Sequence, residues 1–444
     1  MKNKATFITS ATLWSVLFIV LVAAPLFLAA TGHEGEYRGF WIEFGVGLGF
    51  VGLAMMGLQF MLTARSGKIG APFGIDELLQ FHAQIGYIAY FFIIGHFTIL
   101  LITNPAWIDW LNPSDNFPRA LALSSVIILL TALIVFTIWI DKLGLPYECW
   151  RASHGVFAFL ILFIGLVHTL QVAHYVTELW QQVVWTGMTM GAMAFLVHTR
   201  VWRPYQSSKR PYRILSVKKE ADETWSVELE ADGHNGIPFT AGQFAWVTFG
   251  ENAWKIRQHP FTFSSSAAQT RVIRFTIKEL GDFTSEISKL KPGTKAFLEG
   301  PYGNFILESS SAKHNFFIVG GIGITPVMSI LETNKDQGDT RKSTLIYGTP
   351  DMGQTPFMDD LKALAAHPEV DLTVVHVLEE APEGWEGETG LITDELLERY
   401  TPDAVEEYEY YVCGPPPMMD VAEETLRGWG VPVYKIHSER FNIV

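Results

Sequence analysis

The sequence predicts a bundle of six membrane-spanning helices over residues 1–205, a small antiparallel β-barrel over residues 206–310 and an α/β domain over residues 311–444. Three observations lead to this prediction. Long apolar runs fill the chain up to about residue 203, short alternating runs with turn residues follow, and a βαβ pattern begins near residue 315. A chain of 444 residues also exceeds what one hydrophobic core usually holds, so several domains are expected.

The first of these regions contains six apolar stretches, each long enough to span a bilayer, which takes about 20 residues. They cover residues 8–30, 40–63, 79–103, 119–140, 153–176 and 180–199. The first stretch has the basic start and the small end residues of a signal peptide, at Lys2, Lys4, Ala29 and Ala30. Its apolar run is longer than that of a signal peptide. We therefore interpret it as a retained span in contact with the lipid bilayer.

The basic residues predict an orientation, because they are more frequent on the cytoplasmic side of a membrane. Only Arg38 and Arg119 fall on the side opposite to the others. We expect a multi-pass protein of the cell inner (plasma) membrane, with the N-terminus and the C-terminal half in the cytoplasm. The cytoplasmic set comprises Lys2, Lys4, Arg65, Lys68, Lys142, Arg151, Arg200, Arg203, Lys209 and Arg210.

Composition excludes several classes of function. The net charge of −14 and the lack of a basic, aromatic patch argue against binding of nucleic acid. The two cysteines, Cys149 and Cys413, occur in different contexts, so the chain has neither a disulfide framework nor the ligands of an iron–sulfur cluster.

Four histidines of the apolar half form two pairs with the same spacing. His82 and His96 are 14 residues apart, and so are His154 and His168. On a helix this spacing corresponds to about 21 Å and a rotation of about −40°, so both members of a pair face the same way at two depths. Two such helices side by side offer two stacked bis-imidazole sites, which suits a pair of haems. A lone histidine would more simply form an interhelical hydrogen bond, and His174 is a weaker alternative to His168.

This half of the chain resembles the ferric reductase-like transmembrane domain that NADPH oxidases and metalloreductases share. The resemblance covers the six-span layout and the four histidines, and it implies two b-type haems between the third and fifth helices. His82 and His154 would hold the inner haem, and His96 and His168 the outer one. A di-iron site would need clustered histidine boxes, which the sequence lacks.

The second region reads as short strands separated by turns, as in a small barrel. Three motifs occur among these strands. Ala241 to Phe244 opens one strand, Arg257 to Ser264 closes another, and Gly281 to Thr284 precedes a short helix whose free backbone N–H groups would suit a pyrophosphate. The strand candidates are residues 212–218, 225–230, 244–249, 271–278 and 295–299.

In this order the motifs resemble the FAD-binding barrel of the ferredoxin reductase superfamily, and His259-Pro260-Phe261-Thr262 resembles the flavin motif of its NADPH oxidase branch. The resemblance implies that Phe261 packs on the flavin and that Thr262 donates a hydrogen bond near its N5 atom. It also assigns the FAD phosphates to Gly281, Phe283 and Thr284, and a linker to the next domain to Gly300-Pro301-Tyr302-Gly303.

The third region begins with a buried strand at residues 316–319. A glycine-rich turn follows, and a helix starts at about Val327, so the helix N-terminus favours an anionic pyrophosphate. The turn is not the full dinucleotide fingerprint. Later strands at 343–347, 372–377 and 409–412 complete a parallel sheet. The candidate nucleotide-binding residues are Gly320, Gly321, Gly323, Thr325 and Pro326, and then Cys413, Gly414 and Pro415, where the family closes over the nicotinamide.

Two further positions, Glu379 and Phe441, concern which nicotinamide cofactor binds and how it reaches the flavin. NADPH-selective relatives carry a Ser-Arg pair where this chain has Glu379, and a carboxylate there repels a 2′-phosphate and accepts a hydrogen bond from a free 2′-hydroxyl. We therefore favour NADH over NADPH. Phe441 is the candidate for the C-terminal aromatic residue that covers the flavin in the family.

The resemblance implies transfer of electrons from NAD(P)H through FAD to the inner and then the outer haem, with Thr262, Cys413 and Phe441 at the site of hydride transfer. The acceptor would be external, either oxygen, which gives superoxide, or a ferric chelate. Arg38 would either stabilise the anionic product or anchor its helix at the interface. The alternative is an electron-transfer subunit that supplies a partner protein or quinone, and a haem sensor without turnover is disfavoured by the attached reductase module.

Overall fold

The computed structural model describes residues 4–31, 36–65, 73–307 and 312–440, and the chain forms two compact units. One unit is Ile8–Trp202, and the other comprises Arg203–Val444 together with Met1–Phe7. Predicted residue Phe441 therefore lies outside the described residues, as do Lys2 and Lys68.

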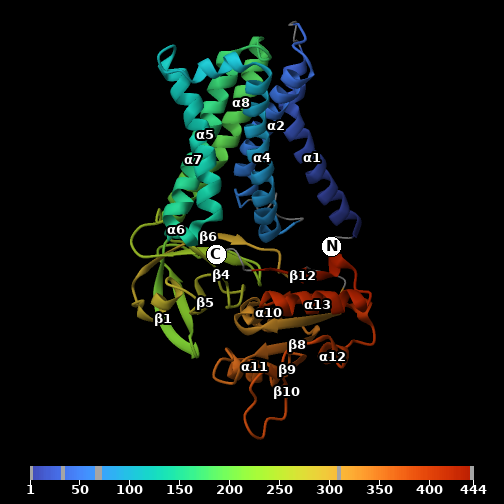
Figure 1. Ribbon diagram of the computed structural model, residues 1–444. Coiled ribbons are helices and arrows are strands. Elements are labelled where there is room, and N and C mark those ends of the chain that lie inside the picture. The colour runs from blue at the N-terminus through green and yellow to red at the C-terminus, as the bar shows by residue number, and fades with distance from the viewer. Residues whose placement is uncertain (1–3, 32–35, 66–72, 308–311, 441–444) are drawn as a thin grey trace. The chain divides into compact units, whose positions relative to one another are not determined.

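The first unit is a bundle of long helices joined by short ones (Figure 1). Its long helices are α1 (Lys4–Ala30), α2 (Phe40–Leu62), α4 (Ile75–Thr103), α5 (Phe117–Ile138), α7 (Tyr147–Val172) and α8 (Leu179–Val197). Its short ones are η1 (Pro105–Leu111), α6 (Ile140–Leu143) and the π-helix η2 (His198–Trp202).

Among the described residues, α1, α2, α4, α5 and α7 are long and apolar enough to cross a membrane. The predicted sixth span corresponds to α8, which is not one of these five. Its first turn contains Gln181 and Gln182, which lower its hydropathy, and the buried Gln181 side chain donates to the carbonyl of Leu28 at 2.9 Å. Five apolar helices are thus established, and the sixth span remains a prediction.

Helices α2 and α4 run antiparallel, side by side, and small residues let their backbones approach (Figure 1). An added Cβ at Gly49 would lie 2.7 Å from His96 Nδ1, and one at Gly52 would lie 2.9 Å from the Ile93 side chain. Any larger residue at these positions would displace α4. The glycines of α2 therefore fix the depth at which His96 lies.

The second unit begins with α9 (Arg203–Ser208) and an antiparallel sheet of six strands in the order β4-β3-β6-β1-β2-β5. A bridge between Phe263 and Phe275 joins the two edges and closes the sheet into a barrel around an apolar core. The strands are β1 (Tyr212–Ala221), β2 (Thr224–Ala231), β3 (Phe244–Phe249), β4 (His259–Thr262), β5 (Val272–Lys278) and β6 (Lys295–Tyr302).

One expectation for the barrel differs from the structure. Gly300, Pro301 and Tyr302 were expected in a linker, but they form the end of strand β6, where Tyr302 pairs with Phe244. The Tyr302 hydroxyl also donates to the carboxylate of Glu299 at 3.1 Å. These contacts extend the barrel up to Gly303, whose φ of 102° ends the strand.

The rest of the unit is a parallel sheet in the order β10-β9-β8-β7-β11-β12. Alternate side chains of β7 enter two cores, one with Phe317 and Val319 against α10 and α11, the other with Phe316 and Ile318 against α12 and α13. Helices therefore cover both faces of the sheet. The strands are β7 (His314–Gly320), β8 (Lys342–Thr349), β9 (Leu372–Leu378), β10 (Glu388–Thr389), β11 (Tyr408–Cys413) and β12 (Ile436–Ser438). The helices are α10 (Ile324–Gln337), α11 (Met358–Ala365), α12 (Asp394–Glu398) and α13 (Pro416–Gly428).

The order of these strands reverses at β7. The chain runs from β7 outward to β8 and β9, then returns to place β11 on the other side of β7. In doubly wound sheets, ligands bind outside the carboxyl ends of the strands at such a switch point. The turns after β7 and β11 therefore mark the expected site of this domain.

Candidate functional site

The outer histidine pair lines a cavity of about 420 Å³ inside the bundle. Both His96 and His168 border it, together with Gly49 and Gly165. His96 Nδ1 lies 2.9 Å from the backbone carbonyl of Gly45, and because a carbonyl only accepts, the imidazole must donate from Nδ1. Its Nε2 atom then carries no proton and has a lone pair for a metal.

The inner pair has the separation that a shared metal requires. The ring centroids of His82 and His154 are 6.1 Å apart. Two imidazoles bound through nitrogen at about 2 Å, each with a ring radius of about 1 Å, place their centroids about 6 Å apart. The separation of the two rings therefore fits two imidazole ligands that share one iron.

The surroundings of His154 also determine which ring nitrogen carries its proton. Its Nδ1 atom lies 3.4 Å from Thr137 Oγ1, and that hydroxyl already donates to the carbonyl of Leu133 at 2.7 Å. Since a hydroxyl has one proton, His154 donates from Nδ1, which leaves Nε2 as the ligand atom. No group of three or more His, Cys, Asp or Glu side chains able to hold a metal occurs among the described residues. Two histidines per site suit a haem, because the macrocycle supplies the other ligands.

A polar cluster that sequence analysis missed borders the same cavity as the outer pair. Arg38 Nη2 donates to the Tyr175 hydroxyl at 2.7 Å, and Tyr175 donates to the carboxylate of Glu43. Arg38 and Tyr175 line the cavity, as does His174. The carboxylate of Glu43 partly balances the charge of Arg38, which sequence analysis assigned either to an anchor or to an external acceptor site. The sequence signal that could have indicated this cluster is Glu43, a carboxylate at the start of an apolar span.

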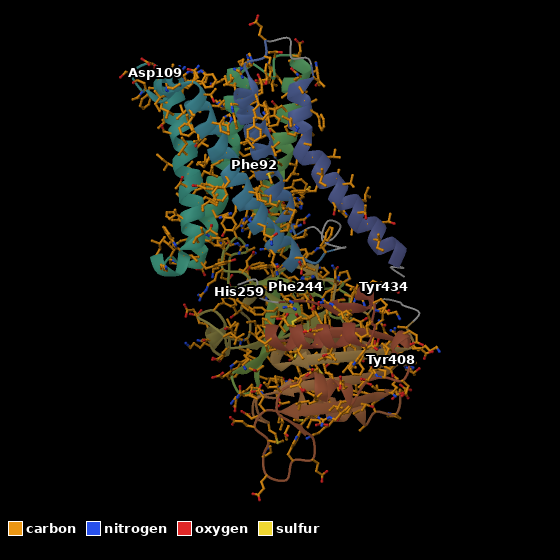
Figure 2. The ribbon with its side chains drawn as sticks, turned by 45° about the vertical axis from the view of Figure 1, so that its right-hand side comes forward. Phe92, Asp109, Phe244, His259, Tyr408 and Tyr434 are labelled. Atoms are coloured by element: carbon orange, nitrogen blue, oxygen red, sulfur yellow. The ribbon has the colours of Figure 1, made fainter. Side chains whose placement is uncertain are left out.

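The predicted flavin motif forms an edge of the barrel. Thr262 pairs with Phe244, so two motifs about 20 residues apart in sequence lie on neighbouring strands, which the Phe244 and His259 side chains mark in Figure 2. The His259 ring stacks on Phe283 at 4.0 Å, and the Phe261 ring lies 6.1 Å from it. The structure therefore brings together Gly281–Thr284 and the motif His259-Pro260-Phe261-Thr262, in which Thr262 is 6% exposed.

The turn at Gly281 differs from its expected form. The N–H groups of Leu280 and Gly281 donate to Thr284 Oγ1 at 2.8 and 3.0 Å, so these two are not free for a phosphate. The following helix, η3 (Thr284–Lys289), is a short 3₁₀ helix. A threonine hydroxyl often satisfies nearby backbone groups in this way.

The two predicted turns of the nucleotide domain pack against each other at the switch point. Cys413 is paired with Val319 across neighbouring strands, immediately before the two turns. An added Cβ at Gly323 would lie 2.4 Å from the Cys413 carbonyl oxygen, and one at Gly320 would lie 2.8 Å from Pro415. Gly321 has a φ of 53°, and an added Cβ at Gly414 would lie 2.9 Å from the backbone nitrogen of Gly320. Only glycines permit this approach.

The first turn of α10 completes this edge. Thr325 and Pro326 are buried there, and Thr325 Oγ1 donates to the carbonyl of Ile322 at 3.0 Å. Sequence analysis did not assign a role to Tyr347, whose hydroxyl donates to the carbonyl of Gly321 at 3.3 Å. Burial raises the pKa of Tyr347 well above its usual value, so its phenol remains a neutral donor that holds the turn.

Cys413 and Glu379 occupy contrasting environments at the same edge. The Cys413 side chain is 1% exposed, and burial raises the pKa of its thiol well above the usual range. Glu379 follows β9 and is exposed, and its backbone N–H donates to the carbonyl of Thr349 at 3.0 Å. Gly348 pairs with both Gly320 and Val377, so Glu379 lies about 10 Å, or two strand spacings, from the glycine turn.

Family models match the chain in three consecutive segments. Residues 48–165 match the ferric reductase like transmembrane component, residues 211–305 match an FAD-binding domain, and residues 317–424 match the oxidoreductase NAD-binding domain. The chain therefore combines a ferric reductase-like transmembrane component with FAD- and NAD-binding modules of the ferredoxin reductase type. The superfamily predicted from sequence is confirmed, and the chain is an oxidoreductase with a membrane component.

Curated relatives match its reductase half. The chain is 33% identical over 162 residues to NADH-cytochrome b5 reductase 2 of Scheffersomyces stipitis, which is 36% of this chain and 54% of that protein. It is 28% identical over 225 residues to NADH-cytochrome b5 reductase 1 of Mycosarcoma maydis, which is 49% of this chain and 68% of that protein. The chain thus spans about half the length of the first of these relatives.

Among solved structures, the second unit resembles the cytochrome b5 reductase domain of Ulva prolifera nitrate reductase. The identity is 18%, the match covers 52% of this chain and 98% of that chain, and the TM-score is 0.46.

Proposed function

We propose that the chain transfers electrons from cytosolic NAD(P)H across the membrane to an external acceptor. The observation that carries this proposal is the inner histidine pair, whose 6.1 Å separation and partly buried position fit one iron between two imidazoles. When bound, FAD would convert a two-electron hydride into single electrons, and haem iron would carry them one at a time.

The nucleotide end of the chain would bind and orient NAD(P)H. The backbone of Gly320, Gly321 and Gly323 and the N-terminus of α10, with Thr325 and Pro326, would hold the pyrophosphate. Cys413, Gly414 and Pro415 would cover the nicotinamide. Glu379 would accept a hydrogen bond from a free ribose 2′-hydroxyl, which favours NADH.

The barrel would hold FAD along its β4 edge. Phe261 would pack on the ring system, and Thr262 would donate near N5. Because the Thr284 hydroxyl already takes two backbone N–H groups, the phosphates would contact the remaining groups of the Gly281–Thr284 turn. Phe441 is proposed to cover the flavin until the nicotinamide arrives.

In the bundle, His82 and His154 would ligate an inner b-type haem, and His96 and His168 an outer one. Hydrogen bonds from the Nδ1 atoms of His96 and His154 would keep their Nε2 atoms free of protons and directed at the iron. The excess of basic residues in the predicted cytoplasmic segments supports an orientation with the reductase unit inside, in the inner (plasma) membrane.

The acceptor is proposed to be oxygen, reduced to superoxide, or a ferric chelate, with delivery to a partner protein or quinone as the alternative. If His96 and His168 both held the outer haem, its iron would have no position open to an acceptor, which would then be reduced at the cavity that Arg38 and Tyr175 border. The polar side chains of Arg38 and Tyr175 at this cavity support a small, soluble acceptor.

The experiment uses purified full-length protein with FAD and NADH. A reduced-minus-oxidised spectrum with b-type haem bands supports the proposal, and a spectrum without them contradicts it. Turnover is then measured with oxygen and, anaerobically, with ferric citrate. Rapid turnover with either acceptor supports a self-contained enzyme, whereas haems that stay reduced with both favour the partner protein or quinone.

A further inference from the structure

Helix α2 presents equivalent positions to the two histidines of α4. Gly45 accepts from His96 Nδ1 through its backbone carbonyl at 2.9 Å. The two helices are antiparallel. Moving 14 residues toward the N-terminus of α4, from His96 to His82, therefore corresponds to moving 14 residues toward the C-terminus of α2, from Gly45 to Gln59. The same 14-residue step rotates each helix by about −40°, so Gln59 stays on the face toward α4. An added Cβ at Gly86, one turn from His82, would lie 3.7 Å from Gln59 Nε2.

The backbone carbonyl of Gln59 cannot accept a hydrogen bond from His82 in the way that the carbonyl of Gly45 accepts one from His96. It already accepts from the backbone N–H of Thr63 at 3.2 Å and from Thr63 Oγ1 at 3.0 Å. A carbonyl oxygen has two lone pairs, and both are used. Any acceptor that α2 offers at this depth must therefore come from the side chain of Gln59.

The side chain of Gln59 is available for this. It is only 6% exposed in an apolar helix, and neither its oxygen nor its nitrogen has a hydrogen-bond partner among the described residues. Nδ1 of His82 is likewise buried without a partner in that part of the chain. An unpaired amide in such surroundings is destabilising, so a residue without a function here would be better replaced by leucine.

We infer that Gln59 is the positioning residue of the inner site, with its Oε1 atom accepting the Nδ1 proton of His82 when haem is bound. This inference rests on the proposed function. The hydrogen bond would fix the tautomer that directs Nε2 at the iron and would make the imidazole a stronger donor. A stronger donor stabilises oxidised iron, so Gln59 would lower the midpoint potential of the inner haem.

The test is a spectroelectrochemical titration of each haem alone. The variant His168→Ala should retain only the inner haem, and His154→Ala only the outer one. In the first background, Gln59→Leu should shift the redox equilibrium about tenfold toward reduction, which is about 59 mV for one electron. Gln59→Glu, with a stronger acceptor, should shift it the opposite way. Met56→Leu, a nearby buried position of α2 without a hydrogen-bonding group, is the control.

The two shifts of opposite sign, confined to the inner haem, support the inference. An inner potential that stays unchanged in both Gln59 variants, with haem bound, overturns it and leaves the proposed function intact. Equal shifts of both haems overturn it as well, because they indicate a general loosening of the bundle. Failure of the unmodified protein to bind haem overturns the proposed function itself.

Discussion

The two units of the chain place their chemistry in different parts of the polypeptide. In the bundle it rests on side chains, namely four histidines, of which His96 packs against Gly49 and hydrogen-bonds to Gly45, and His154 hydrogen-bonds to Thr137. At the switch point of the α/β sheet it rests on the backbone, where glycines let two turns meet. The bundle should therefore fail when a side chain is removed, and the sheet should fail when one is added.

The largest effect is expected from removing a ligand in the bundle. His154→Ala and His168→Ala should each lose one haem and abolish transfer to an external acceptor, while reduction of FAD by NADH continues in the other unit. Haem content per protein and anaerobic FAD reduction are the measurements. His198→Ala, at the end of α8, is the matched control and should keep both haems. Full haem content in a ligand variant would contradict the assignment.

The next-largest effect is expected from adding a side chain at the switch point of the α/β sheet, where the chemistry rests on the backbone. Gly323→Val would place a Cβ 2.4 Å from the Cys413 carbonyl oxygen, which forces the two turns apart. A misplacement of about 1 Å typically costs about 100-fold in rate, and we expect that loss for FAD reduction by NADH in a stopped-flow experiment. Gly428→Ala is the control, because an added Cβ there meets nothing within 4 Å. Normal rates in Gly323→Val would show that the turns do not need to touch.

The same contrast explains what could be predicted from sequence. Helices α1, α2, α4, α5 and α7 follow from hydropathy alone, because the bilayer requires long apolar runs. The same reasoning predicts α8 as a sixth span, but its glutamines lower its hydropathy, and one of them, Gln181, donates to a carbonyl of α1. The spacing of the histidines indicated two depths because a helix converts sequence spacing directly into distance.

Contacts between distant segments were beyond sequence reasoning. Glu43 and Tyr175 are 132 residues apart, and nothing in either segment indicates the hydrogen bond between them. The free N–H groups expected at Gly281 were wrong in part, because whether Thr284 turns back onto the backbone depends on local torsions. The register that pairs Thr262 with Phe244 likewise depends on how β3 and β4 meet, which the sequence of neither strand specifies.

A smaller effect is expected at Glu379, a side chain that is proposed to act at the site of the α/β sheet. Glu379→Ser removes the carboxylate that would repel a 2′-phosphate, so the ratio of kcat/KM for NADPH to that for NADH should rise about tenfold, or about 1.4 kcal/mol. Glu383→Ser, also exposed and in the same loop, should leave the ratio unchanged. If the unmodified protein prefers NADPH, the role given to Glu379 is wrong.

The smallest effect is expected at Cys413, where the sheet site carries a titratable group but would not use its charge. Burial raises the pKa of this thiol, and a raised pKa favours the neutral form, so ionisation begins only at a higher pH than for an ordinary cysteine. The rate of FAD reduction should therefore show no thiol inflection between about pH 7 and pH 9, which brackets the ordinary value of about 8.5.

Cys413→Ala should then follow the same pH profile at a slightly different rate, because the buried thiol packs in an apolar core and would supply no proton. An inflection near the ordinary cysteine value, present in the unmodified protein and absent from Cys413→Ala, would show a thiolate at work. The sheet would then depend on a charged side chain, and the contrast with the bundle would fail at a residue where the two turns meet.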